Sequence, residues 1–310
     1  MAVTGGAFAQ ATLTGALAYG YSSVTSGAGV TTSGGGIDTS TLKFTATEDL
    51  GDGNSVTAFI ATDGSSGRTA NMAMDDQEIT LKMSGVALNV GSSKGGDWLT
   101  GASGGATYYG LDGRLLSSRT INEKVGISLP IMEGLTLSIV QYGADTITYE
   151  STGNGGMGLN STTQGNTTYN LKYVAGALTV QAGYKGYTNV GTTDSYTNNL
   201  SRVGANYDLG FAKVGAAWDA TNFGSTGTRS RAMVSASAPV GPLKLNMEWV
   251  SSSVTSSLLA TAGTRTGYML GAQYDFSKRT SAVLNYGSWL NAVGDAQNKN
   301  LTAVTLAHSF

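Results

Sequence analysis

The chain has 310 residues, 12% of them charged, a net charge of −2, 45 glycines, 3 prolines and no cysteine. The missing cysteines exclude disulfides and thiolate metal sites, and no basic cluster is present that would neutralise nucleic-acid phosphates. No run reaches the roughly 18 consecutive apolar residues of a membrane-spanning helix. The composition instead fits apolar side chains that face lipid and alternate with small polar ones that face water.

The first nine residues end in Ala7-Phe8-Ala9, which is the A-x-A pattern of a signal-peptidase site, directly before Gln10. No basic region and little apolar length precede this pattern. We therefore interpret residues 1–9 as the remnant of a secretory signal peptide. The alternative is a frayed first strand segment. Residues 10–310 are predicted to form a single domain.

Alternation of apolar and polar residues between turn signals predicts sixteen strands. The first five cover residues 11–22, 41–47, 55–62, 77–84 and 87–91. Five hairpins follow, namely 122–129 with 135–142, 168–174 with 177–187, 200–208 with 211–219, 230–238 with 243–251 and 267–275 with 280–290, before a last strand at 301–310.

Short turns alternate with long loops rich in Gly, Ser, Thr and Asn, so the two ends of the predicted sheet differ. A sheet in lipid cannot leave an edge unpaired and has to close. Sixteen strands enclose a water-filled channel instead of a packed interior. The sequence therefore predicts an all-β fold, a transmembrane antiparallel up-and-down β-barrel with long outer loops and short periplasmic turns.

The last strand shows the alternation most clearly. Val304, Leu306, His308 and Phe310 fall on one face, and the intervening small residues fall on the other. A strand that ends on an aromatic residue is typical of a sheet whose rim lies at a membrane–water interface.

The same alternation assigns faces to the other strands. The apolar sets predicted to face lipid or a neighbouring subunit are Leu42/Phe44, Val125/Ile127/Leu129, Leu171/Tyr173, Leu178/Val180, Val214/Ala216/Trp218 and Leu243/Leu245/Met247/Trp249. Aromatic residues gather near strand ends, as expected for interfacial girdles. The alternative is the core of a soluble sandwich, but 7 Phe and 4 Trp are few for a core of this size.

The opposite faces are predicted to line the channel, and their charges are unequal. The basic residues assigned to the pore are Lys43, Lys82, Lys124, Lys172, Lys185, Arg202, Lys213, Arg231 and Lys244. Only Glu78, Asp208 and Glu248 clearly join them among the acids, because the other carboxylates concentrate in loops and turns. A cationic lumen between low-dielectric walls favours anions. The alternative is that each lysine extends to a rim and leaves the lumen nearly neutral.

The segment 92–120 is too long for a tight turn between the fifth and sixth strands. It carries Asp97, Trp98, Tyr108, Tyr109, Asp112, Arg114 and Arg119. A disordered surface loop is the alternative to a structured one.

Three features together resemble the general porins of Gram-negative bacteria, of the beta-proteobacterial type. They are Thr47-Glu-Asp-Leu-Gly-Asp-Gly53 after a Leu-Lys-Phe strand, the long segment 92–120, and the ending Ala307-His-Ser-Phe310. The resemblance implies a homotrimer in the outer membrane that passively conducts ions and small hydrophilic solutes. It also implies that the barrel-insertion machinery reads Phe310, and that segment 92–120 is an inward-folded constriction loop. Here Lys43 and Lys82 replace the arginine cluster usual on the facing wall.

No catalytic constellation or cofactor site is predicted. His308 is the only histidine, so a histidine-dependent serine enzyme is poorly supported. The glycine-rich stretch 153–158 lacks the strand and helix of a dinucleotide-binding unit, and Asp75-Asp-Gln-Glu78 reads as solvated charge more readily than as a cation site. The sequence predicts a passive diffusion channel with a modest anion preference. The alternative is a structural or adhesive barrel, or one that sheathes a partner.

Overall fold

The computed structural model describes residues 10–25, 29–63, 73–94, 121–143, 165–188, 198–224, 227–255, 263–289 and 299–310. These residues form sixteen strands: β1 (Gln10–Thr25), β2 (Thr31–Gly51), β3 (Asn54–Asp63), β4 (Ala73–Met83), β5 (Val86–Lys94), β6 (Ile121–Met132), β7 (Leu135–Tyr142), β8 (Gly165–Ala175), β9 (Leu178–Thr188), β10 (Asn199–Asp208), β11 (Lys213–Asn222), β12 (Thr228–Val240), β13 (Leu243–Thr255), β14 (Gly263–Asp275), β15 (Thr280–Trp289) and β16 (Lys299–Ser309).

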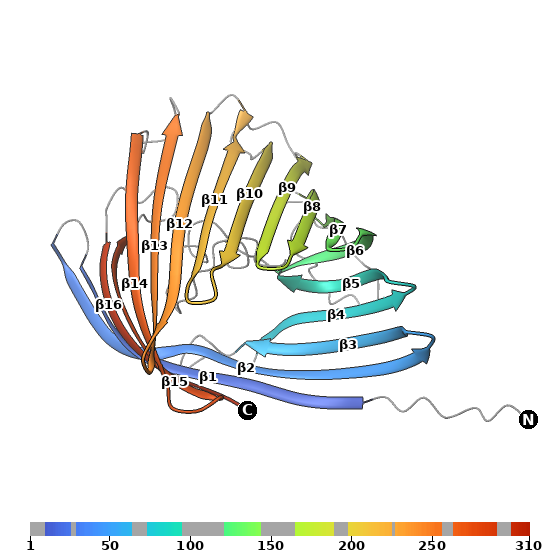
Figure 1. Cartoon of the computed structure of the whole chain (residues 1–310), viewed down its shortest axis with the longest axis horizontal. Coiled ribbons are helices and arrows are strands. Elements are labelled where there is room, and N and C mark those ends of the chain that lie inside the picture. The colour runs from blue at the N-terminus through green and yellow to red at the C-terminus, as the bar shows by residue number, and fades with distance from the viewer. Residues whose placement is uncertain are drawn as a thin grey trace, which may run out of the picture.

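Each strand pairs antiparallel with its neighbours in the chain, and β1 pairs with β16, so that the sheet closes into a barrel. In Figure 1 the strands of one wall, β10 to β14, run across those of the opposite wall, β2 to β5, as expected for strands tilted around a barrel. The predicted all-β, sixteen-strand barrel is confirmed. Among the described residues, no helix is long and apolar enough to cross a bilayer.

The register separates an outer face from an inner one, because residues directly opposite in neighbouring strands share a face. On β13, Met247 and Trp249 are 49% and 41% exposed, whereas the intervening Glu248 and Val250 are fully buried. Most residues of the apolar sets that the sequence assigns to lipid are likewise exposed, and Ile127, Leu129, Leu178 and Val180 are partly exposed. This alternation is the pattern of a sheet with a lipid face and a lumen face.

Aromatic side chains border the apolar band of the outer face on both sides. Trp218, Trp249, Tyr268 and Tyr286 lie toward the long loops, and Tyr207, Phe211, Tyr274, Phe276 and Phe310 lie near the short turns. Such girdles mark the two membrane–water interfaces of an outer-membrane barrel. The apolar band between them is therefore the part of the barrel that the hydrocarbon layer surrounds.

Phe310 closes the seam between the first and last strands. The amide of Gly15 donates to the carbonyl of Phe310 at 2.9 Å, and the amide of Phe310 donates back to Gly15 at 3.0 Å. The ring of Phe310 lies over Gly15, where an added Cβ would collide with it. An aromatic side chain thus covers a glycine that exposes backbone on the outer face, as in other sheets.

Most strand boundaries differ from the prediction by one to four residues, and two differences have an identifiable cause. β2 begins at Thr31, ten residues before its predicted start, since β1 offers a ladder partner as far as Thr25. β11 begins at Lys213 and not at residue 211, because the amide of Leu209 bonds the carbonyl of Ala212 at 2.8 Å and closes a longer turn. Phe211 belongs to that turn and is 73% exposed.

Candidate functional site

The inner wall of the barrel gathers the charged side chains. By register, all nine basic residues that the sequence assigns to the pore fall on the inner face: Lys43, Lys82, Lys124, Lys172, Lys185, Arg202, Lys213, Arg231 and Lys244. Lys82, Lys172, Lys213 and Lys244 lie at the short-turn end of four separate strands. The others lie nearer the middle or the loop end of their strands.

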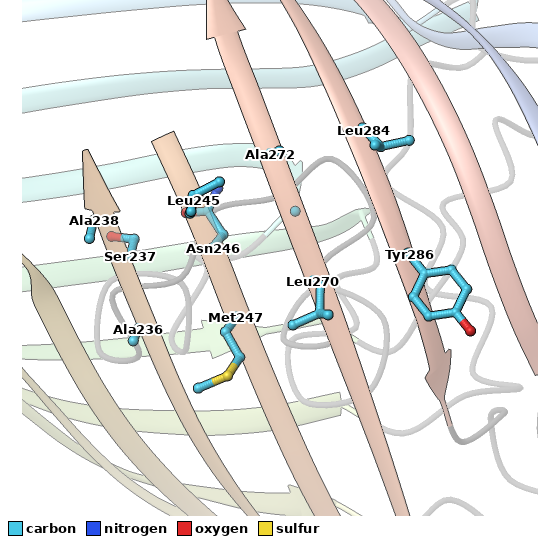
Figure 2. Close-up of a pocket in the computed structure, with 11 residues that line it drawn as sticks. Ala236, Ser237, Ala238, Leu245, Asn246, Met247, Leu270, Ala272, Leu284 and Tyr286 are labelled. Carbon is cyan, nitrogen blue, oxygen red and sulfur yellow. The ribbon is translucent and has the colours of Figure 1, made fainter. Parts of the chain in front are cut away.

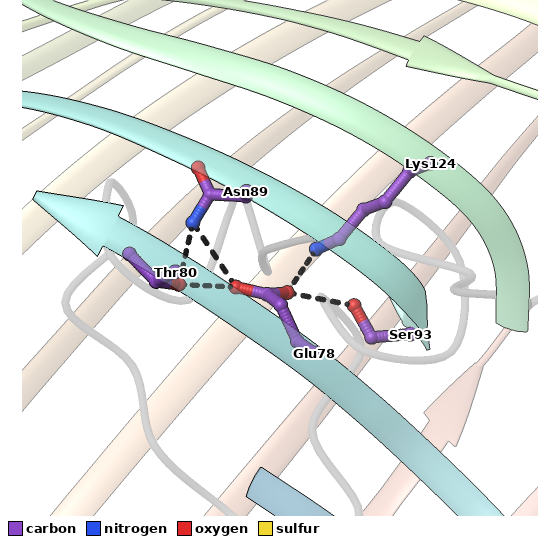
Figure 3. A network of polar contacts seen from close by, with 5 residues as sticks. All are labelled: Glu78, Thr80, Asn89, Ser93 and Lys124. Atoms are coloured by element: carbon purple, nitrogen blue, oxygen red, sulfur yellow. Dashed lines mark hydrogen bonds and ion pairs between the residues drawn. The ribbon is translucent and has the colours of Figure 1, made fainter. Parts of the chain in front are cut away.

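Glu78 is the centre of a group of polar contacts on the inner face of β4 to β6. Its Oε2 accepts an ion pair from Nζ of Lys124 at 2.6 Å and a hydrogen bond from Oγ of Ser93 at 3.1 Å. Its Oε1 accepts from Oγ1 of Thr80 and Nδ2 of Asn89, both at 3.1 Å (Figure 3). The lysine reaches across a whole strand, since the residue between the two partners is Gly91, which has no side chain. Lys124 is therefore neutralised locally.

A second charge group lies on β10 to β12. Arg231 forms a bidentate pair with Asp219, with Nε to Oδ1 at 2.9 Å and Nη2 to Oδ2 at 2.5 Å. Nε of Arg202 lies 3.8 Å from the same Oδ2 on the other side. Asp219 is fully buried and Arg231 is 7% exposed, so this carboxylate has little contact with water and depends on its two cations.

Asp219 and Arg229 were not in the predicted sets, and both lie on the inner face. Asp219 lies an even number of residues from Lys213 on β11 and directly opposite Arg231. The alternation of faces along the strand was therefore sufficient to assign it to the inner face. Arg229 lies two residues before Arg231 on β12 and therefore on the same face. The predicted strand began at residue 230 and left Arg229 in a loop. The guanidinium donates from Nη2 to Oγ1 of Thr221 at 3.3 Å, and its central carbon lies 5.5 Å from the ring of Phe223.

Two further lysines lie against aromatic rings. Nζ of Lys43 is 3.6 Å from the ring centroid of Phe59, and Nζ of Lys185 is 5.7 Å from that of Tyr142. Contact with the ring face attracts an ammonium group without cancelling its charge. Among the described residues, neither lysine has an ion pair that would cancel its charge.

The predicted constriction-loop residues Asp97, Trp98, Tyr108, Tyr109, Asp112, Arg114 and Arg119 lie outside the described residues, as does the predicted signal-peptide remnant 1–9. Ser92, given as the first residue of that loop, still belongs to β5, which ends at Lys94. In the part of the chain that the structure describes, no group of three or more acidic or histidine side chains could hold a metal ion.

Comparison with known proteins agrees with this architecture. Residues 1–291 match the family model for Gram-negative porins. The chain belongs to the Gram-negative porin family. No curated protein sequence matches it.

The porin is also similar to solved structures. The anion-selective porin from Comamonas acidovorans is 17% identical with a TM-score of 0.73, and the match covers 98% of this chain and 100% of that one. Salmonella typhi OmpF, in complex with daunomycin, is 13% identical with a TM-score of 0.76 and 97% coverage of both chains. The Acinetobacter baumannii channel DcaP is 12% identical with a TM-score of 0.75 and the same coverage. At these identities the likeness establishes the shared barrel fold.

Family membership confirms the predicted localisation and class of activity. This porin is an outer-membrane channel for passive diffusion and not an enzyme. Its inner wall is therefore the functional surface.

One groove of about 460 Å³ lies on the outer face over β12 to β15 (Figure 2). Its floor is made of small residues, including Ala236, Ala238 and Ala272, and leucine side chains such as Leu245 and Leu284 border it. These residues belong to the lipid-facing set between the two aromatic girdles. The groove is thus part of the surface that contacts hydrocarbon and lies apart from the channel.

Proposed function

We propose that this porin conducts small anions in preference to cations, and that the basic residues of its inner wall set this preference. The observation that carries the proposal is the charge balance of the described inner face. Its nine predicted basic residues and Arg229 outnumber the carboxylates that the register places on the same face, namely Asp49, Glu78, Asp208, Asp219, Glu248 and Asp275. Of these, Glu78 and Asp219 are already engaged in ion pairs. Low-dielectric walls strengthen the field of the remaining cations in a narrow lumen.

We further propose that the functional unit is a homotrimer in outer-membrane lipid and that Phe310 is the residue recognised by the barrel-insertion machinery. A related barrel, OmpT of Vibrio cholerae, is described in a trimer form and is 13% identical, with a TM-score of 0.69 and coverage of 97% of this chain and 99% of that one. The ring of Phe310 is half-exposed on the outer face, where a partner can reach it.

Planar-bilayer recording tests both proposals. Purified protein is added to a membrane that separates two KCl solutions of unequal concentration, and the reversal potential is measured. A reversal potential of the sign given by chloride, with conductance steps in groups of three, is expected. A reversal potential of the sign given by potassium would refute the anion preference. A folded barrel without conductance would favour the structural or sheath role.

A further inference from the structure

Four cations and one carboxylate face a common volume on β9 to β12. Lys185, Leu200, Thr221 and Arg229 follow one another in a single register row across these four strands. Arg202, Asp219 and Arg231 form the next row toward the short turns. Because their side chains all point inward, the cationic groups of both rows border the same part of the lumen.

The carboxylate of Asp219 does not neutralise the four cations equally. Asp219 gives both oxygens to Arg231 and holds Arg202 at 3.8 Å. Among the described residues, no carboxylate lies within ion-pair distance of Lys185 or Arg229. Nε of Arg229 is buried and has no hydrogen-bond partner in the described part of the chain. Both residues are half-buried, so water screens their charges incompletely.

Two neutral side chains lie next to these cations by register. Tyr187 lies one register row nearer the loops than Lys185, within electrostatic reach of Arg202 and Arg229. Thr168, 3% exposed, lies beside Lys185 in the same row, and its hydroxyl donates to Oδ1 of Asn166 at 3.0 Å. A half-buried cation without a counter-charge is costly, and a guanidinium fork matches two oxygens of one oxyanion. This arrangement favours an anion with several oxygens over chloride.

The other basic residues lack this combination. Lys124 is neutralised by Glu78 at 2.6 Å, and Lys43 lies over an aromatic ring with no second cation from a neighbouring strand in its register row. The lysines at the short-turn end are spread over separate strands. On the described inner wall, it is therefore along β9 to β12 that several cations converge and that Nε of Arg229 is left without a hydrogen-bond partner.

We propose that this wall is a binding site for divalent oxyanions, in which Lys185 and Arg229 hold the anion and Arg202 adds attraction. Phosphate, sulfate and dicarboxylates share the required chemistry, namely two charges and paired oxygens. The inference rests on the proposed anion-conducting function and deepens it. A divalent anion bound there is retained longer than chloride and slows the chloride current while it stays.

The experiment measures inhibition of the chloride current by sulfate, phosphate or succinate, each titrated at constant ionic strength. The current is expected to fall to a plateau, and the three titrations show which oxyanion binds best. R229Q and K185Q should each raise the half-inhibitory concentration about tenfold, because each removes a charge-assisted hydrogen bond. R229K keeps the charge but loses the fork, so a smaller rise is expected.

K213Q is the matched control, because it removes one inner-face charge at the short-turn end, away from the site. It should lower the chloride preference and leave the half-inhibitory concentration within about twofold of the unsubstituted protein. An equal loss of inhibition in K213Q and R229Q would show a diffuse field and overturn the site. Inhibition that is unchanged in R229Q and K185Q would overturn it as well.

Calorimetric titration of the detergent-purified protein with sulfate provides a readout that needs no conduction. Heat that disappears in R229Q but not in K213Q supports the site even if the bilayer shows no anion preference. An anion-selective channel without sulfate binding refutes the site and leaves the proposed function in place. The two proposals therefore fail separately.

Discussion

Replacing Asp219 by Asn tests whether the buried ion pair holds β10, β11 and β12 together. The substitution preserves shape and removes the charge that two guanidinium groups share. Arg231 donates two hydrogen bonds to this carboxylate, at 2.9 and 2.5 Å. Each hydrogen bond to a charged group contributes about 1.5–3 kcal/mol, and the amide retains one acceptor oxygen. The loss of one bond and of the charge predicts a decrease of about 3 kcal/mol in the free energy of unfolding.

Urea unfolding of the protein in lipid vesicles, followed by tryptophan fluorescence, measures this decrease. E133Q, an exposed carboxylate-to-amide change in the turn after β6, is the control and should leave stability unchanged. The double variant D219N/R231M should lose less free energy of unfolding than the sum of the losses in the two single variants. Removing Arg231 together with the carboxylate means that this buried cation is no longer left without its partner. A D219N variant as stable as E133Q would refute the reasoning.

Three further substitutions test separate features. E78Q should raise the chloride-to-potassium permeability ratio roughly twofold, as expected for one unit charge at about 8 Å in water, with a smaller effect at high salt; an unchanged reversal potential would contradict this. G287A should lower the free energy of unfolding by about 1–3 kcal/mol, since its Cβ would overlap the backbone of β14, whereas G34A, with open space around it, should be neutral. G15V should displace the ring of Phe310 and slow assembly, measured as the heat-modifiable folded fraction over time; assembly at the unsubstituted rate would show that the ring is not needed there.

The strand order could be predicted because the lipid face imposes a period of two. Wherever apolar residues alternate with polar ones, as in Leu243 to Trp249, the sequence defines both the strand and its orientation. The signal fails in residues 31–40, where Gly34, Gly35 and Gly36 carry no side chain to assign to a face. The hydrogen-bonded ladder with β1 nevertheless continues there, because backbone pairing needs a partner strand and no apolar side chain.

The inner wall was predictable in part, because alternate side chains along a strand point to the inside and the outside of the barrel. This alternation does not show which side chains meet across strands. Glu78 and Lys124 are forty-six positions apart in the chain, and they meet only because the closed barrel places Gly91 between them. The register of three strands is needed to recognise that pair.

The charge that a passing ion experiences therefore differs from the count of basic residues. Lys124, Lys185 and Arg231 are equivalent as inward-facing cations in the sequence. In the barrel, Glu78 neutralises the first at 2.6 Å, and Asp219 binds the third through both of its oxygens. Lys185 has an aromatic neighbour and no carboxylate within ion-pair distance among the described residues, so no ion pair cancels its charge. On the described inner wall, Arg229 adds a second cation without an ion-paired carboxylate along β9 to β12, and selectivity should follow those two residues more closely than the total number of lysines and arginines.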